Sequence, residues 1–188
     1  PGFGDYVPYD QYKGALPTPK FAHGYTQYAN FSGWDTYRSQ AQLLAWLFPV
    51  EASDMMKSLV SEADQCGIFP KWAEYNFEAN IMNGDPAAGI IAGSYAFGAK
   101  DFPAAKSLEY LKTSGMIVGT HCQHAVERPG LQEYMTYGYI PDKTPGVWGP
   151  VATSLEYAVA DSAVAQFAKA LGDIPTFQFF AKRSGSWR

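Results

Sequence analysis

Glu156 is the residue in this sequence whose type and surroundings point most directly to chemistry. It lies in the apolar stretch PVATSLEYAVADSAVAQFAKAL, and no Lys or Arg stands three or four positions away from it. A helical ion-pair partner would have to occupy one of those positions, so burial would leave this carboxyl group uncharged near neutral pH. A protonated carboxylic acid facing a cavity is what a general acid requires. The structural alternative is an ion pair with a distant arginine, Arg38 or Arg128.

Asp161 is a second acid in the same stretch, five positions after Glu156. In a helix this offset is about 140° around the axis and ~7.5 Å along it. The two side chains would therefore face different surroundings and could not act as a catalytic pair. We interpret Asp161 as structural.

Two further acids stand near the starts of expected helices, Asp35 in GWDTYR and Asp85 in NGDPAAG. Loops rich in Trp, Tyr and Phe lead into these helices and into the helix of Glu156. Carboxylates accept hydrogen bonds from hydroxyls and aromatic faces stack on sugars, so this group suits a polyhydroxylated ligand. The structural alternatives are helix capping by Asp85 before Pro86, and capping by Asp35 together with Arg38.

Three pairs of helices are expected to position these acids. In each pair a charge-poor helix of small residues precedes an amphipathic one, and the pairs begin near residues 37, 86 and 150. The first helix suits an inner layer and the second an outer layer, so we predict an all-α toroid of helical hairpins whose parallel inner helices start at one mouth. An open solenoid of helix pairs is the alternative. We expect an irregular lead-in segment over residues 1–33 and the partial toroid over residues 34–188.

Composition narrows the classes of function. The chain of 188 residues has a net charge of −4, with 17% charged and 16% aromatic residues. An acidic chain without a basic cluster is atypical of nucleic-acid-binding proteins, and no apolar run is long enough to span a membrane.

The chain begins without Met or a signal peptide, so we expect a mature product or a fragment. Cys66 and Cys122 could pair or stay as thiols, and the HCQH motif lacks a fourth zinc ligand.

Five blocks in order, from about Tyr25 to Arg188, resemble glycoside hydrolase family 92, the exo-acting α-mannosidases. They are ANFSGWDTYRSQ, GIFPKW, NGDPAAGIIAGSYAFGA, RPGLQEYMTYGYIP and TSLEYAVADSAVAQFAKALGD with FAKRSGSWR. The resemblance implies a catalytic (α/α)6 toroid preceded by a β-sandwich. It also implies calcium as cofactor, hydrolysis of terminal α-mannosides of glycans with inversion, and a secreted or extracytoplasmic protein.

The resemblance also assigns roles to individual residues. Glu156 matches the position of the family's general acid. The other matches are to residues that bind the sugar or line its pocket: Trp34, Asp35, Lys71, Trp72 and Asp85.

The family's general base and calcium ligands lie downstream of the RSGSWR block, where this sequence ends. We therefore expect about three hairpins of six, the general acid without its base, no metal ligand in this chain, and almost no activity of the chain alone. The partners would be a mannose-containing glycan and the remainder of the catalytic domain. Two other hypotheses stay open: a non-catalytic helical-repeat module that binds carbohydrate or protein, and another toroid hydrolase or lyase whose second carboxylate is Asp35 or Asp85.

Overall fold

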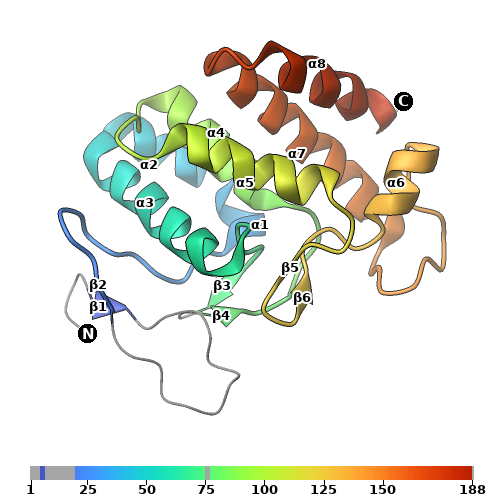
Figure 1. The fold of residues 1–188 in the computed structure, drawn as a ribbon, viewed down its shortest axis with the longest axis horizontal. Helices are drawn as coiled ribbons and strands as arrows, with labels where there is room; N and C mark the ends of the chain where they lie inside the picture. Colours follow the sequence, from blue (N-terminus) through green and yellow to red (C-terminus); the bar gives the residue numbers. More distant parts are fainter. Residues whose placement is uncertain (1–4, 7–19, 75–76, 188) are drawn as a thin grey trace.

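Three helical hairpins lie side by side in the computed structural model, which describes residues 5–6, 20–74 and 77–187 (Figure 1). The helix pairs are α2 (Gln40–Leu47) with α3 (Pro49–Cys66), α4 (Pro86–Phe97) with α5 (Ala104–Met116), and α7 (Pro150–Ala170) with α8 (Ile174–Arg183). This mainly helical arrangement confirms the predicted fold class, part of a helical toroid.

Short elements precede, connect and follow the hairpins. They are the helices α1 (Gly33–Thr36) and α6 (Leu131–Tyr137), the 3-10 helix η2 (Ser184–Trp187), and three antiparallel strand pairs, β1 (Asp5–Tyr6) with β2 (Lys20–Phe21), β3 (Ala73–Glu74) with β4 (Phe77–Glu78), and β5 (His121–Cys122) with β6 (Ala125–Val126). Most of the predicted lead-in over residues 1–33 lies outside the described residues, so its boundary stays a prediction. None of the described helices has both the length and the apolar character that crossing a bilayer requires.

The charge-poor helices α2, α4 and α7 pack against one another in chain order. Helix α4 lies between the other two, and its Ala88 and Ile91 are completely buried, at 0% exposure. Val164 of α7 and Leu111 of α5 join the same apolar core. A helix enclosed on all sides needs an apolar surface all round, which explains why α4 contains no charged residue.

Two glycines of α4 allow the first hairpin to approach closely. A Cβ atom at Gly89 would lie 2.9 Å from Cδ2 of Tyr37, and one at Gly93 would lie 2.5 Å from Nε2 of Gln42. Even alanine would therefore force Tyr37 and Gln42 outward. The small-residue pattern of α4 is thus what positions the segment between α1 and α2.

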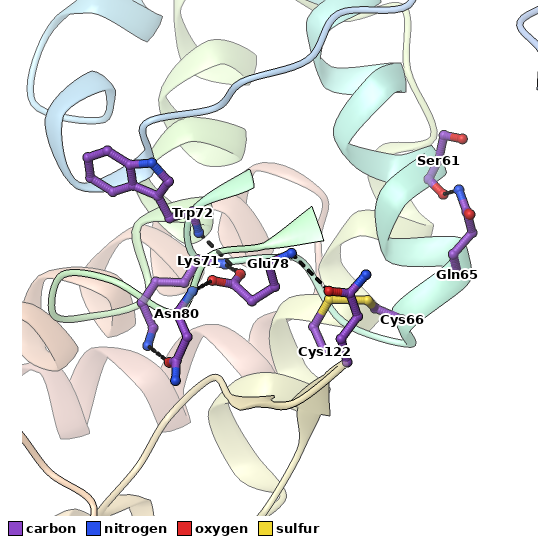
Figure 2. The surroundings of a disulfide bond; sticks show 9 residues. Ser61, Gln65, Cys66, Lys71, Trp72, Glu78, Asn80 and Cys122 are labelled. Atoms are coloured by element: carbon purple, nitrogen blue, oxygen red, sulfur yellow. Dashed lines mark hydrogen bonds between the residues drawn. A yellow bond between two sulfur atoms is a disulfide. The ribbon is translucent and has the colours of Figure 1, made fainter. Parts of the chain in front are cut away.

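A disulfide between Cys66 and Cys122 joins the end of α3 to strand β5 (Figure 2). The sequence leaves this pairing open, because it does not show that two cysteines with a sequence separation of 56 meet in space. The turn between β5 and β6 is thereby fixed to the outer layer. It lies beside the β3–β4 hairpin, which follows Lys71 and Trp72 (Figure 2).

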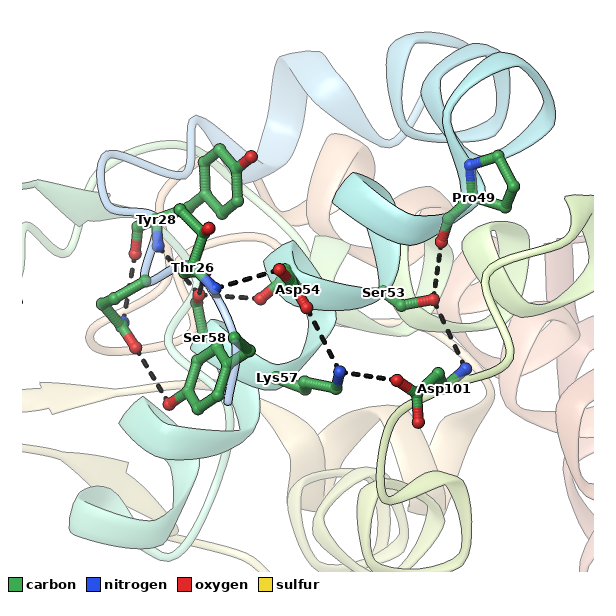
Figure 3. A network of polar contacts seen from close by, with 10 residues as sticks. Thr26, Tyr28, Pro49, Ser53, Asp54, Lys57, Ser58 and Asp101 are labelled. Carbon is green, nitrogen blue, oxygen red and sulfur yellow. Dashed lines mark hydrogen bonds and ion pairs between the residues drawn. The ribbon is translucent and has the colours of Figure 1, made fainter. Parts of the chain in front are cut away.

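Side chains of α3 hold the extended segment that precedes α1 (Figure 3). The backbone N–H of Thr26 donates to Oδ2 of Asp54 at 2.9 Å, and that of Tyr28 donates to Oγ of Ser58 at 2.9 Å. These bonds satisfy backbone groups that have no helical or strand partner. The segment that leads to Trp34 is therefore attached to a helix.

Candidate active site

Glu156 lies in the second turn of α7, and two side chains from the first hairpin region bind its carboxylate. Tyr37 Oη donates to Oε2 at 2.6 Å, and Arg38 Nη2 donates to Oε1 at 2.9 Å. The predicted apolar site without a counter-charge is therefore wrong, and the alternative pairing with Arg38 is the one observed. The fold brings these partners from 118 and 119 positions away, beyond what helical spacing can indicate.

Tyr37 is a stable hydrogen-bond donor in this position. Burial, followed by its hydrogen bond to Glu156, raises the pKa of Tyr37 to about 12. The hydroxyl therefore keeps its proton at neutral pH and points it at the carboxylate. Gly89 provides the space in which the Tyr37 ring lies.

The Arg38 guanidinium covers the aromatic face that the sequence assigns to the sugar. Its Cζ lies 4.4 Å from the ring centroid of Trp34 and 4.9 Å from that of Tyr37. The Arg38 side chain is 46% exposed, whereas that of Glu156 is 17% exposed. A cation therefore lies between an indole face and a carboxylate at the edge of the site. Asp35 is exposed beside them, in the first turn of α1.

The starts of the inner helices meet at this place, as the sequence pattern predicts. A Cβ atom at Gly84 would lie 2.7 Å from Cβ of Glu156. A Cβ atom at Gly33 would lie 2.3 Å from the carbonyl oxygen of Lys71 and 2.6 Å from Cγ of Pro86. The segments before α1, β3 and α4 are thus in direct contact with one another or with Glu156.

Asp85 turns toward the interior instead of the mouth. Its Oδ2 accepts hydrogen bonds from Arg128 Nε at 2.8 Å and from Ser114 Oγ at 2.9 Å. Asp85 occupies the N-cap position of α4 but makes no side-chain capping bond, so the capping interpretation is wrong. The role of Asp85 in sugar binding stays a prediction.

Asp161 is completely buried between two arginines. Its Oδ1 accepts from Arg128 Nη1 at 2.8 Å and from Arg183 Nη2 at 2.7 Å, and its Oδ2 accepts from Arg183 Nε at 2.6 Å. The structural interpretation of Asp161 is confirmed. Asp85, Arg128, Asp161 and Arg183 form one chain of charges that links the start of α4 to α7 and α8.

Lys71 and Trp72 precede β3, on the segment that touches Gly33. Lys71 is 5% exposed and its Nζ donates to Oδ1 of Asn80 at 3.3 Å. Trp72 is half-buried. Their contacts with a sugar stay predictions, but both residues lie on the same side of the molecule as the start of α4.

Sequence analysis missed three buried acids next to this segment, Glu62, Glu78 and Glu127. Each is at most 2% exposed. Burial, followed by the nearby charge of Glu78, raises the pKa values of Glu62 and Glu127 well above 4.5. Both oxygens of Glu62 lack a hydrogen-bond partner among the described residues. No local signal in the sequence indicates their burial, and Glu127 even stands directly before Arg128.

No metal centre is formed by the described residues, since nowhere among them do three His, Cys, Asp or Glu side chains gather closely enough to hold an ion. Cys122 of the HCQH motif is bound in the disulfide. The residues present therefore do not fit a complete calcium site.

Comparison with known proteins places the chain among carbohydrate-active enzymes. A family model described as "Glycosyl hydrolase family 92 catalytic domain" matches residues 3–188. No curated protein matches the chain significantly.

Solved structures agree with this match. The family GH92 α-mannosidase BT3965 from Bacteroides thetaiotaomicron, in complex with mannoimidazole, is 29% identical with a TM-score of 0.83, over 98% of this chain and 22% of that one. The inverting mannosidase BT2199 from Bacteroides thetaiotaomicron VPI-5482 is 22% identical with a TM-score of 0.79, over 98% of this chain and 25% of that one, and shows the fold alone. The chain thus spans less than a quarter of the length of BT3965.

Proposed function

Because the chain belongs to glycosyl hydrolase family 92, we propose that it forms part of the catalytic domain of an inverting exo-α-mannosidase. The substrate would be a terminal α-mannoside of a glycan. The observation that carries the proposal is the position of Glu156, where the starts of the inner helices meet beside the face of Trp34. A carboxyl group next to an aromatic face suits protonation of a bound glycoside.

Glu156 would act as the general acid and protonate the departing glycosidic oxygen. In inverting enzymes a second carboxylate activates water about 6.5–9.5 Å away, on the other face of the sugar, and we place that base in another part of the protein. A sugar stacking on Trp34 would displace the Arg38 guanidinium from the indole. Glu156 would then lose its ion-pair partner and keep the hydrogen bond from Tyr37. Tyr37 would keep the carboxyl group oriented through its hydroxyl.

Calcium would act together with residues outside this chain. The family is calcium-dependent, but the described residues offer no complete ligand set, so we assign this chain no metal-dependent step. Its own residues bind and orient the sugar and carry the proton.

The rest of the catalytic domain would pack against the two edges of the inner layer, which α2 and α7 form on either side of α4. Large apolar side chains are exposed on both of these helices. They are Leu43, Trp46, Leu47, Val151, Leu155 and Val159, with exposures between 47% and 76%. Apolar exposure at both edges supports the proposal that further hairpins complete the toroid.

The enzyme would work outside the cytoplasm. The disulfide between Cys66 and Cys122 supports this placement, because structural disulfides form and persist in oxidising compartments.

The test is Glu156→Gln in the full-length enzyme, assayed with aryl α-mannosides of good and poor leaving groups in the presence of calcium. Loss of a general acid should lower kcat for the poor leaving group about 10²- to 10⁴-fold, with a smaller loss for the good one. Binding of methyl α-mannoside should persist. Glu109→Gln, the same change at a 66% exposed side chain, is the control. Retained turnover of the poor leaving group by Glu156→Gln would refute the assignment.

A non-catalytic carbohydrate-binding module is the second candidate, and the Glu156–Arg38 ion pair favours it. In that case the wild-type protein would bind methyl α-mannoside and hydrolyse no α-mannoside. The same assays therefore distinguish the two functions.

A further inference from the structure

Glu78 carries a buried carboxylate that the proposed reaction does not use. Its Oε2 accepts hydrogen bonds from the backbone N–H of Lys71 at 2.6 Å and of Trp72 at 3.2 Å (Figure 2). Its Oε1 accepts one from the backbone N–H of Asn80 at 2.6 Å. A fully buried carboxylate is stable only with several such donors. The residue is 0% exposed, so a sugar could not reach it.

The same carboxylate governs how Lys71 is oriented. The Lys71 ammonium donates to Oδ1 of Asn80, and Asn80 has a positive φ of 52°. Asparagine is one of the few residues besides glycine that adopt this conformation readily. Glu78 fixes it in place by accepting from the Asn80 N–H, and it accepts from the Lys71 N–H as well. Both partners of the Lys71–Asn80 contact are therefore held by one group.

Glu78 is in turn fixed by a residue next to the disulfide. Its backbone N–H donates to Oε1 of Gln123 at 3.1 Å. Gln123 directly follows Cys122, in the turn between β5 and β6, and also has a positive φ, 53°. Because Cys122 is bonded to Cys66, the covalent link to α3 fixes the side chain that anchors β4.

We propose that Glu78 is a positioning residue for sugar binding, which fixes the backbone from which Lys71 and Trp72 reach the substrate. The inference rests on the proposed function, since it takes these two residues as sugar contacts. Glu78 acts on the sugar only through them, with Gln123 and the disulfide as its anchor.

Glu78→Gln in the full-length enzyme tests this role. Glutamine keeps the shape but directs an NH2 group at backbone N–H donors, so at least one of the three bonds is lost. The loss of a hydrogen bond to a charged group should raise KM, and the Kd of methyl α-mannoside, about tenfold or more, with kcat kept within about twofold. Glu109→Gln makes the same change at a 66% exposed side chain of α5 and should alter neither constant.

Trp72→Ala separates failure of this inference from failure of the proposed function. If Trp72→Ala weakens binding and a folded Glu78→Gln does not, the positioning role is overturned. If neither change affects Kd while hydrolysis persists, the segment does not contact the sugar and the inference is wrong, although the mannosidase assignment stands. If the wild-type enzyme hydrolyses no α-mannoside, the proposed function fails, while the comparison of Kd values still decides the role of Glu78.

Gln123→Leu covers the case in which Glu78→Gln does not fold. It removes only the outer acceptor, so Kd should rise less than for Trp72→Ala but clearly above the value of Glu109→Gln. A Kd equal to that of Glu109→Gln would overturn the inference.

Discussion

Replacing Asp161 by asparagine should destabilise the protein more than an isosteric replacement of any other polar side chain that the structure describes on α7. The carboxylate is 0% exposed and receives three hydrogen bonds from Arg128 and Arg183, at 2.6 to 2.8 Å. Asparagine removes the charge and turns one acceptor into a donor that faces a guanidinium. The four-membered chain of charges, balanced with Asp85, is then left with one excess positive charge.

The magnitude follows from this imbalance. Removing one partner of a buried ion pair costs about 3–5 kcal/mol, because the remaining charge stays buried and uncompensated. The Nη2 atom of Arg128 already has no hydrogen-bond partner among the described residues. The guanidinium therefore has few other acceptors that could replace the Asp161 carboxylate. For a chain of this length each kcal/mol lowers Tm by about 2–4 °C, which gives an expected fall of roughly 6–20 °C.

Thermal and urea unfolding followed by far-UV circular dichroism would measure the effect. Asp101→Asn is the matched control. It makes the same change in an exposed ion pair, because Asp101 pairs with Lys57 and its side chain is 89% exposed. Exposed pairs contribute less than about 1 kcal/mol. If Asp161→Asn unfolds within about 1 kcal/mol of the wild type, then the arginines are satisfied in some other way and the reasoning from burial is refuted.

Two further predictions concern stability. Burial raises the pKa of Glu62 well above 4.5. The stability that its protonated form contributes is therefore fully present below about pH 4.5 and is lost as the pH rises through the raised pKa. Glu62→Gln should flatten this fall in the urea unfolding midpoint above about pH 4.5, and an unchanged slope would contradict the burial argument. Replacing both Cys66 and Cys122 by serine should lower the free energy of unfolding by about 4 kcal/mol, because the disulfide closes a loop with a sequence separation of 56. Dithiothreitol should destabilise the wild type to the same degree and leave the double variant unaffected. Equal sensitivity of the two proteins to dithiothreitol would argue against the bond.

The helical hairpins could be predicted from the sequence because their signals are local. The absence of charge in α4, and the Asp85-Pro86 start before it, are visible within a dozen residues. The exclusion of Asp161 as a partner of Glu156 also needed only helical geometry. Local periodicity therefore sufficed wherever one helix decided the outcome.

The environment of the acids could not be predicted, because it depends on contacts between distant segments. Glu62 belongs to an amphipathic helix whose acids would be expected to face water, yet it is 2% exposed. Arg38 lies in the loop before α2 and reaches Glu156 only because α2, α4 and α7 pack in order. The apolar sequence around Glu156 and the resemblance to a family both indicated this residue, but only the tertiary structure shows which groups surround it.

The glycines around Glu156 make the site vulnerable to changes that alter no polar group. Gly84 has a φ of +90° and leaves no space for a methyl group beside Glu156, and Gly33 leaves none beside the Lys71 carbonyl. An alanine at either position would displace Glu156 or the segment of Lys71, although every hydrogen-bonding side chain would stay the same. The geometry around Glu156 thus depends on two residues that have no side chain of their own.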